Sequence, residues 1–378
     1  MNINSTIISG SQAINDIRYL LTSRQHVLFV TDRNIVQQPG VQALLNQVKA
    51  NVPAITLIDN VPPEPSQHDV AHILEALPNA RTELVIGVGG GSVLDVAKLL
   101  SLLCVSDDAV SLETLLAGEK PTRRTASLLI PTTAGTGSEA TPNAILAIPE
   151  KATKVGIITP VMLPDYVALV PELTTSMPSH IAASTGIDAL CHLIECFTAT
   201  IANPVGDNYA LIGLKKLFAN IELSIREPEN LEARLNMLWA SYYGGAAIAH
   251  AGTHLVHAMS YPLGGKYHIP HGVANAILLA PCMRFVRPAV EEKFAQAYDL
   301  LPEANLSLSV TEKSHALVTY FTDLVQRLAL PSSLQQLGIE KTHLPDLVEG
   351  ALQVQRLMKN VPAAVKADDV RDIYLTLF

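Results

Sequence analysis

Asp188 and His192 lie four residues apart in GIDALCHLIEC, residues 186–196, a segment whose pattern predicts a helix. Residues at i and i+4 of a helix share one face, with Cβ atoms about 5–6 Å apart. A carboxylate and an imidazole in this arrangement can bind one divalent cation together. In an isolated pair of this spacing, the aspartate more often caps a helix or pairs locally, and the histidine is more often a hydrogen-bonded core residue. A second histidine-rich segment, HLVHAMSYPLGGKYHIPH at residues 254–271, offers further ligands and favours a metal site.

Two glycine-rich turns have the composition of phosphate-binding turns. The first, Gly89-Gly90-Gly91-Ser92, follows the apolar run ELVIGV and precedes a predicted helix. Glycine lets the backbone approach a phosphate closely, and the free N–H groups at a helix start favour an anion. A G-x-G-x-x-G fingerprint is not complete here, because Ser92 ends it. The second turn, TTAGTGSE at residues 132–139, places three threonines and one serine after another apolar run, SLLIP.

The predicted secondary structure that positions these residues changes once along the chain, from alternating strands and helices to helices alone. Up to about residue 175, short apolar runs alternate with helix-like segments; the runs are His26–Thr31, Ala54–Ile58, Glu83–Val88, Ser127–Pro131, Val155–Thr159 and Tyr166–Val170. Such runs suit strands buried on both faces of a parallel sheet. From Pro178 onward the pattern is helical. We therefore predict an α/β domain over residues 1–177, an all-α domain over residues 178–378, and a cleft between them.

Composition limits the class of protein. The 378 residues are 48% apolar and 16% charged, which indicates a compact globular protein with a net charge of −9 that argues against nucleic-acid binding. The four cysteines have no C-x-x-C spacing, and we expect all of them to be buried apolar groups. A signal-peptide pattern and apolar runs of membrane-spanning length are absent from the sequence. We expect a cytoplasmic enzyme that is a homodimer or a larger homo-oligomer.

Four motifs together resemble one family. GGGSVLDVAK, PTTAGTGSEAT, GIDALCHLIE and HAMSYPLGGKYHIPHGVANA, in this order, are similar to the iron-containing alcohol dehydrogenases over nearly the whole chain. The resemblance implies a Rossmann-like nicotinamide-binding domain, a helical metal domain, and reversible hydride transfer between a small alcohol or diol and its aldehyde or ketone. It also implies four metal ligands: Asp188, His192, His257 and His271.

The resemblance assigns the cofactor contacts as well. Gly89, Gly90, Gly91 and Ser92 would hold the pyrophosphate, and Thr132, Thr133, Thr136 and Ser138 would line the nicotinamide side. Asp32 matches an aspartate that faces the adenosine ribose and favours NAD over NADP, and Lys154 matches a lysine near the cofactor ribose. One carboxylate and three imidazoles suit Fe²⁺ or Zn²⁺, and the sequence leaves the choice between them open. Such an ion acts as a Lewis acid that lowers the pKa of a bound alcohol.

Two positions depart from the family pattern. Tyr261 stands where many relatives have a histidine that carries the proton away, and Glu64 stands where several have asparagine near the adenine. Three proton routes remain open: the Tyr261 hydroxyl, His268, or water with the cofactor ribose. An ordinary histidine titrates near ~6.5 and an ordinary tyrosine near ~10, so we expect His268 to be the better relay.

Other side chains and other functions have simpler explanations. His250 and His254 are expected to share a helical face with His257, while Trp239, Tyr242 and Tyr243 are expected to pack between helices. A lyase similar to dehydroquinate synthase would need a Lys/Arg cluster around the metal, and residues 180–275 contain few bases. A metal-free enzyme similar to maleylacetate reductase, or a non-catalytic binder, would have no need of four intact ligands.

Overall fold

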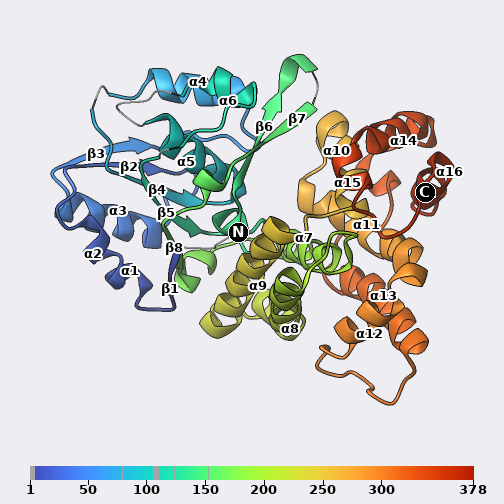
Figure 1. Ribbon diagram of the computed structural model, residues 1–378. Helices are drawn as coiled ribbons and strands as arrows, with labels where there is room; N and C mark the ends of the chain where they lie inside the picture. The colour runs from blue at the N-terminus through green and yellow to red at the C-terminus, as the bar shows by residue number, and fades with distance from the viewer. Residues whose placement is uncertain (1–4, 79, 105–109, 123, 152) are drawn as a thin grey trace. The chain divides into compact units, whose positions relative to one another are not determined.

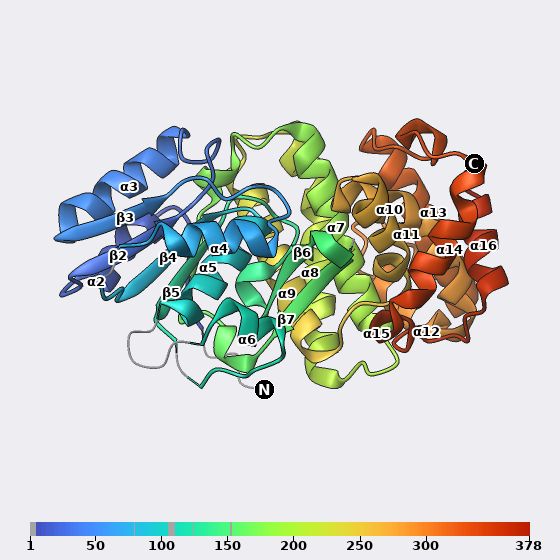
Figure 2. The same cartoon turned by 90° about the horizontal axis from the view of Figure 1, so that it is seen from above.

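The computed structural model describes residues 5–78, 80–104, 110–122, 124–151 and 153–378, which fold as a mixed α/β region followed by helices (Figures 1 and 2). They group into two compact units. The first comprises Met1–Thr133, Gly137–Met177 and Pro228–Leu238. The second comprises Ala134–Thr136, Pro178–Glu227 and Trp239–Phe378.

A six-stranded sheet, parallel throughout, organises the first unit. Its strand order is β1-β8-β5-β4-β2-β3. The strands are β1 (Thr6–Ser9), β2 (His26–Val30), β3 (Ala54–Ile58), β4 (Leu84–Gly89), β5 (Ala126–Pro131) and β8 (Tyr166–Leu169). The parallel sheet predicted from the apolar runs is confirmed. Both glycine-rich turns therefore follow neighbouring strands, β4 and β5, at the edge where ligands of such sheets bind.

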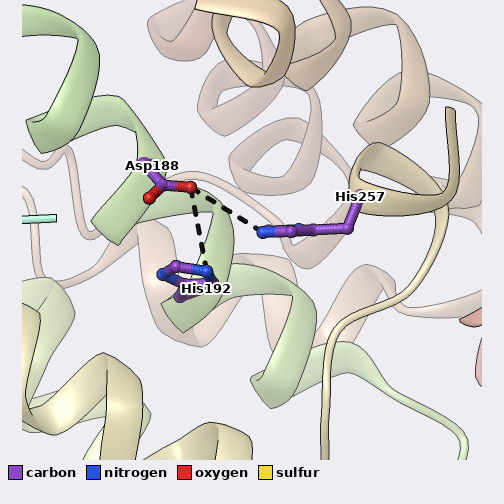
Figure 3. Close-up of side chains that lie close together, drawn as sticks. All are labelled: Asp188, His192 and His257. Atoms are coloured by element: carbon purple, nitrogen blue, oxygen red, sulfur yellow. Dashed lines mark ion pairs between the residues drawn. The ribbon is translucent and has the colours of Figure 1, made fainter. Parts of the chain in front are cut away.

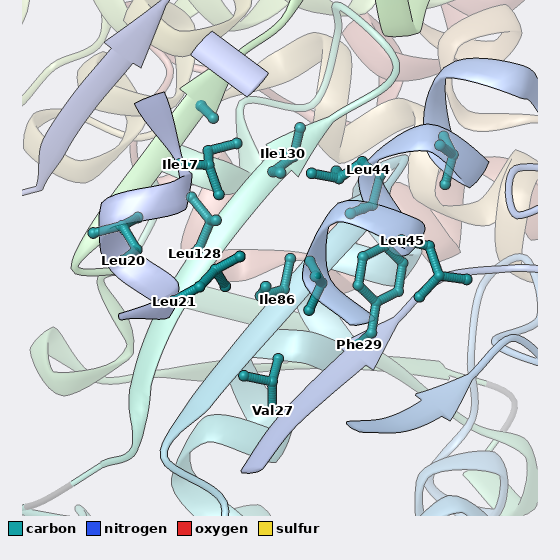
Figure 4. Close-up of a cluster of buried hydrophobic side chains, with 14 of the residues drawn as sticks. Ile17, Leu20, Leu21, Val27, Phe29, Leu44, Leu45, Ile86, Leu128 and Ile130 are labelled. Atoms are coloured by element: carbon teal, nitrogen blue, oxygen red, sulfur yellow. The ribbon is translucent and has the colours of Figure 1, made fainter. Parts of the chain in front are cut away.

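Helices cover both faces of this sheet. The helices on one face are α1 (Ala13–Asp16), α2 (Arg18–Leu21) and α3 (Pro39–Asn51), and those on the other are α4 (Gln67–Glu75), α5 (Gly91–Leu103) and α6 (Leu112–Leu116). Figure 4 shows the first core, where Phe29, Ile86 and Leu128 of the strands meet Leu44 and Leu45 of α3. Helix α5 lies very close to β4, since a Cβ on Gly87 would come within 2.6 Å of the Ala97 Cβ.

Two of the predicted strands differ from expectation. Residues 155–159 do not join the parallel sheet: β7 (Thr153–Ile158) pairs antiparallel with β6 (Asn143–Ile148) in a separate hairpin. Ile158 is 52% exposed, so this strand is not buried on both faces. The β3 strand lies at the sheet edge, where Leu57 is 39% exposed. An apolar run alone does not distinguish an edge strand or a hairpin from a central strand.

The second unit is helical. Its helices include α7 (Ser179–Thr198), α8 (Pro204–Arg226), most of α9 (Leu231–His250), α10 (Leu255–Tyr267), α11 (His271–Val286), α12 (Glu291–Tyr298), α13 (Val310–Arg327), α14 (Leu344–Gln353), α15 (Gln355–Met358) and α16 (Ala367–Leu375). Asn203 caps α8 by accepting a hydrogen bond from the Gly206 N–H. Helix α7 packs against α8 and α11, while α10 packs against α11, α14 and α15. Among the described helices, none combines the length and apolar character that crossing a membrane requires.

Candidate metal centre and cofactor site

Helix α7 carries two buried polar side chains on one face. The Asp188 Oδ1 lies 3.7 Å from the His192 Nε2, as the i,i+4 spacing predicted (Figure 3). The Nδ1 of His192 lies 3.2 Å from the Gly135 carbonyl oxygen. This carbonyl accepts a hydrogen bond if Nδ1 carries the proton, which leaves the Nε2 lone pair on the Asp188 side. Gly135 is required at this contact, because a Cβ there would come within 2.7 Å of the Thr185 carbonyl oxygen.

Two further histidines reach the same carboxylate oxygen from other helices. His257 of α10 places its Nε2 at 3.7 Å from the Asp188 Oδ1, and His271, the first residue of α11, places its Nε2 at 3.6 Å. The His192 and His257 rings stack with centroids 4.7 Å apart. Ligand atoms bound at ~2.1 Å to a tetrahedral ion lie about 3.4 Å from one another. Asp188, His192 and His257 thus have ligand atoms within 4.8 Å of one another, a spacing that one divalent ion can bridge, and His271 approaches the same Asp188 oxygen from α11.

Electrostatics favour the protonation states that metal binding requires. Burial opposes ionisation of Asp188, but the facing His192, His271 and His257 rings outweigh it and hold the pKa of this carboxyl below its ordinary value. Burial, and then the neighbouring His192 ring, lowers the pKa of His257 to about 3. A carboxylate and a neutral imidazole are the forms that bind metal ions at neutral pH.

Glu195 is a functional residue that the sequence analysis missed. Its Oε2 lies 2.5 Å from the His257 Nδ1, and its Oε1 accepts a hydrogen bond of 2.6 Å from the Val256 N–H. Glu195 is buried, and burial raises its pKa. A carboxylate bonded to the second ring nitrogen fixes the orientation and tautomer of a metal-binding histidine. Glu195 follows His192 by three residues on α7, and this helical spacing was the only feature of the sequence that could have indicated its role.

Asn275 of α11 is the second residue that was missed. Its Nδ2 donates a hydrogen bond of 2.7 Å to the Asp188 Oδ1 and lies 3.2 Å from the His271 Nε2. Its Oδ1 is buried without a hydrogen-bond partner among the described residues. The amide therefore lies against the ligand set itself. Asn275 follows His271 by four residues, which is again helical spacing.

The expectation for His254 was wrong. α9 ends at His250, and His254 is the N-cap residue of α10, so the two do not share a helical face with His257. The His254 Nδ1 accepts the Leu255 N–H at 2.7 Å, and its Nε2 lies 2.9 Å from the Thr198 hydroxyl. The rings of Trp239, Tyr242 and Tyr243 contact one another along α9, and the Tyr243 ring also stacks on Tyr209 of α8, which is the packing between helices that was expected for Tyr243.

The structure brings Tyr261, but not His268, to the ligands. The Tyr261 ring lies 6.4 Å from the His271 ring, between centroids. Burial raises the pKa of Tyr261, although the charge of Arg356 opposes this rise. His268 caps the end of α10 with φ 55°, and its side chain is exposed. Within the described part of the chain, this side chain forms no hydrogen bond to a metal ligand.

The two glycine-rich turns meet where β4 and β5 end. The Thr132 N–H donates a hydrogen bond of 3.0 Å to the Gly89 carbonyl, and Gly90 is the N-cap residue of α5. The N-terminus of α5, which begins at Gly91, has no side-chain cap, so its N–H groups suit an anion such as a pyrophosphate. The Thr132 hydroxyl is buried without a partner among the described residues. Thr133 lies beside Gly90, at 3.6 Å from the position of a Cβ there.

Ser138 and Thr136 differ from the rest of the second turn. The Ser138 hydroxyl donates to the Asp95 Oδ1 at 2.5 Å, and its carbonyl accepts from the Lys98 Nζ at 2.8 Å. Lys98 also forms an i,i+3 ion pair with Asp95. Ser138 therefore fixes the turn onto α5. Thr136 belongs to the residues that group with the second unit.

Lys154 of β7 reaches the start of α5 through Glu64. The Lys154 Nζ lies 2.7 Å from the Glu64 Oε1, and the Glu64 N–H donates to the Ser92 hydroxyl at 3.1 Å. Glu64 adopts a left-handed conformation with φ 50°. Asp32, which follows β2, uses its Oδ1 to accept the N–H groups of Asn34 and Ile35, both at 2.9 Å.

The parallel α/β sheet, its glycine-rich turns and the carboxylate–imidazole cluster of the helical unit have the organisation expected of a metal-dependent oxidoreductase. Sequence profiles described as "Iron-containing alcohol dehydrogenase" and "Fe-containing alcohol dehydrogenase family, C-terminal" match residues 4–171 and 182–378. The chain belongs to the iron-containing alcohol dehydrogenase family and is a metal-dependent alcohol dehydrogenase.

Similar proteins cover the chain almost completely. Long-chain-alcohol dehydrogenase 1 of Geobacillus thermodenitrificans is 32% identical over 94% of this chain and 90% of its own. The crystal structure of a 1,3-propanediol oxidoreductase is 29% identical and superimposes with a TM-score of 0.91, covering 99% of this chain and 98% of its own. The sulfoacetaldehyde reductase of Bifidobacterium kashiwanohense, solved with NAD⁺, is 26% identical with a TM-score of 0.85, covering 99% and 97%.

Proposed function

We propose that this chain catalyses NAD-linked interconversion of small alcohols or diols with their aldehydes or ketones, using one Fe²⁺ or Zn²⁺ ion. The observation that carries the proposal is the placement of three imidazole Nε2 atoms at 3.6–3.7 Å from one buried Asp188 oxygen. Asp188, His192, His257 and His271 would hold the ion. A divalent ion in this set supplies Lewis acidity, which lowers the pKa of an alcohol and polarises a carbonyl.

The residues of the chain determine orientation and charge around that ion. Glu195 keeps the Nδ1 proton of His257 on the side away from Asp188, so the Nε2 lone pair is available. The uncapped start of α5 and the Thr132 hydroxyl supply donors for the cofactor phosphates. A bound nicotinamide supplies the hydride acceptor or donor.

The test is a reconstitution assay with matched ligand variants. The purified chain is stripped of metal, loaded separately with Fe²⁺ or Zn²⁺, and assayed with short alcohols and diols and either cofactor. We expect activity only after loading, and none in His271→Ala, whereas His315→Ala, which changes an exposed histidine on α13, retains it. Full turnover by the stripped enzyme would contradict the proposal.

Asp32 supports a preference for NAD. A carboxylate near the adenosine ribose repels a 2′-phosphate and accepts hydrogen bonds from a 2′-hydroxyl. We expect kcat/KM to be higher with NAD than with NADP, and Asp32→Gly to narrow the difference. A native preference for NADP would show that Asp32 lies elsewhere in the bound complex.

We also propose that the chain is a cytoplasmic homo-oligomer, a dimer or larger. All four cysteines are free thiols, which fits a reducing compartment. β1 lies at one edge of the sheet, and its Ile7 is 36% exposed, so this edge is available for pairing with another chain. Sedimentation equilibrium of the wild type measures the mass, and a monomer at micromolar concentration would contradict this part of the proposal.

A further inference from the structure

The predicted metal centre is shared between helices, so its geometry depends on how these helices are held together. Asp188 and His192 lie on α7, and His257 of α10 points toward them (Figure 3). The His257 Nε2 lies 3.7 Å from the Asp188 Oδ1 only if the start of α10 has a fixed place against α7. Side chains that fix the start of α10 therefore act on the ligand set.

His254 connects the two helices through both nitrogens of its buried ring. It is the N-cap residue of α10, and its Nδ1 accepts the Leu255 N–H at 2.7 Å. Burial lowers the pKa of His254, so the ring is neutral and its single proton lies on Nε2. The Nε2 donates this proton to the Thr198 hydroxyl oxygen on α7, at 2.9 Å. The Thr198 hydroxyl donates in turn to the Ile194 carbonyl at 2.7 Å, so each donor has one acceptor.

Glu195 supplies a second connection between α7 and α10. Its Oε1 accepts the Val256 N–H at 2.6 Å, and its Oε2 lies 2.5 Å from the His257 Nδ1. His254 and Glu195 thus take the first two free N–H groups of α10, which have no partner within the helix itself. The Glu195 Oε1 also lies 3.2 Å from the His254 Nδ1. Both atoms are acceptors, so the orientation of the His254 ring depends on its bonds to Leu255 and Thr198.

Asn360 holds the linker before α10 independently of Thr198. Its buried side-chain amide donates to three successive carbonyls, those of Ala251, Gly252 and Thr253, at 2.8, 3.2 and 3.1 Å. Its own carbonyl accepts the Thr200 N–H at 3.0 Å, just after the end of α7. The linker should therefore keep its place when the Thr198 hydroxyl is removed. The effect of that removal then falls on the His254 ring and the first turn of α10.

We propose that Thr198 and His254 are positioning residues of the metal centre, whose hydrogen bond fixes the first turn of α10 so that the His257 Nε2 faces the ligands on α7. Neither residue would touch the ion. Hydrogen bonds outside the ligand set orient the ligands before the ion arrives, and their loss typically lowers metal affinity about 10- to 100-fold. This inference rests on the proposed function, because it concerns the same ligand set.

Competition with a chelator for Zn²⁺ tests the inference. Thr198→Val removes the hydroxyl and keeps the branched shape, while His254→Asn keeps an acceptor that can cap α10 but is too short to reach Thr198. We expect each variant to lower the Zn²⁺ affinity about tenfold. The double variant should lose no more than either single variant, because both remove the same hydrogen bond. Thr198→Ser keeps the hydroxyl and should stay within about threefold of the wild type.

Two further measurements separate positioning from folding. The visible spectrum of the Co²⁺-loaded protein depends on ligand geometry, so Thr198→Val should change it and Thr198→Ser should not. The Tm of the metal-free protein monitors the fold and should change little in either variant. Thr322→Val is the matched control, because it removes a threonine hydroxyl that donates to the carbonyl four residues earlier on α13. It should leave the affinity and the spectrum unchanged.

The outcomes distinguish this inference from the proposed function, since metal binding requires no turnover. Weaker Zn²⁺ binding in Thr198→Val and His254→Asn supports the positioning role even if no alcohol is oxidised. Wild-type affinity and spectrum in both variants would overturn it and leave the dehydrogenase proposal intact, whatever happens to the Tm. An equal loss of affinity in Thr198→Ser would also overturn it, because the hydroxyl would then be irrelevant. A wild-type chain that binds no Zn²⁺ would overturn both.

Discussion

Glu195 shows how one buried side chain prepares another for chemistry. It accepts from the Val256 backbone and bonds the His257 Nδ1, so the imidazole has one orientation and one tautomer. These two bonds oppose the energetic cost of burying the carboxyl, although burial still raises its pKa. The metal centre therefore depends on a residue that would not touch the ion.

Glu195→Gln tests this dependence. The amide keeps the size of the side chain but loses the charge that holds the Nδ1 proton, so we expect metal affinity to fall about 10- to 100-fold. Competition with a chelator of known affinity measures this change. Glu232→Gln, on an exposed part of α9, is the control. Unchanged affinity in Glu195→Gln would mean that packing alone orients His257.

The proton route is a second question at the residue scale. Burial raises the pKa of Tyr261, so its hydroxyl keeps its proton at neutral pH and is a poor base. We expect His268→Ala to lower kcat for alcohol oxidation near pH 7 more than Tyr261→Phe does. A larger loss of kcat in Tyr261→Phe would assign the proton relay to the phenol. No loss in either variant would indicate that water and the cofactor ribose carry the proton.

The buried Glu139 should make the stability of the folded chain depend on pH. Both of its carboxylate oxygens are buried without hydrogen-bond partners among the described residues, and burial raises its pKa to about 7. Because this folded-state pKa is raised, the group's contribution to stability is fully present below about pH 4.5 and is lost as the pH rises to about 7. We expect Glu139→Gln to raise the Tm relative to wild type at pH 8 more than at pH 5. An equal shift at both pH values would contradict this assignment.

At the scale of elements, the β6–β7 hairpin and the turn at Glu64 act together on the start of α5. The hairpin supplies Lys154, the turn supplies Glu64, and the Glu64 N–H holds the Ser92 hydroxyl. The carboxylate of Glu64 neutralises the one lysine that the family pattern places near the cofactor ribose. Two elements outside the main sheet thereby set the charge at the predicted cofactor site.

Removal of the Lys154 charge and removal of the Glu64 charge should change the affinity for NADH in opposite directions. Lys154→Met removes a cation from the site and should weaken NADH binding about tenfold, whereas Glu64→Gln releases the lysine and should strengthen it. Fluorescence titration with NADH measures both, and Lys120→Met, at an exposed position outside these elements, is the control. Two changes in the same direction would show that the ion pair only stabilises the hairpin.

Over the whole molecule, the sequence predicted the features that follow from local patterns, namely strands and helix faces. It missed the contacts between residues that are far apart in the chain. Continuous apolar runs identified the central strands, but the short β1, with one buried residue, was not found. The spacing of Asp188 and His192 predicted that their side chains lie together on one face of α7, and they do. Asn275 lies far along the chain from Asp188, and its place beside that carboxylate follows only from tertiary contacts. The sequence analysis placed His254 wrongly because the helical conformation is interrupted at Gly252, where φ is 74°.

The division into two units leads to a prediction for the whole chain. All four predicted metal ligands lie in the second unit, and the predicted phosphate-binding turn at Gly89–Ser92 lies in the first. A ligand that binds only the native state stabilises it by about 2.7 kcal/mol at a free concentration of one hundred times its Kd. Removal of the metal should therefore weaken the second unit selectively, and NADH should protect the first.

Hydrogen exchange followed by mass spectrometry measures the two units separately. We expect chelation to speed exchange in peptides from α7, α10 and α11, with smaller changes in β2, β4 and β5. NADH added to the chelated protein should slow exchange around the start of α5, because the helix N–H groups there would bind the phosphates. The His271→Ala variant is the matched control, since chelation should add little to its exchange rates. Uniform acceleration of exchange over both units would show that the ion stabilises the chain as one cooperative structure.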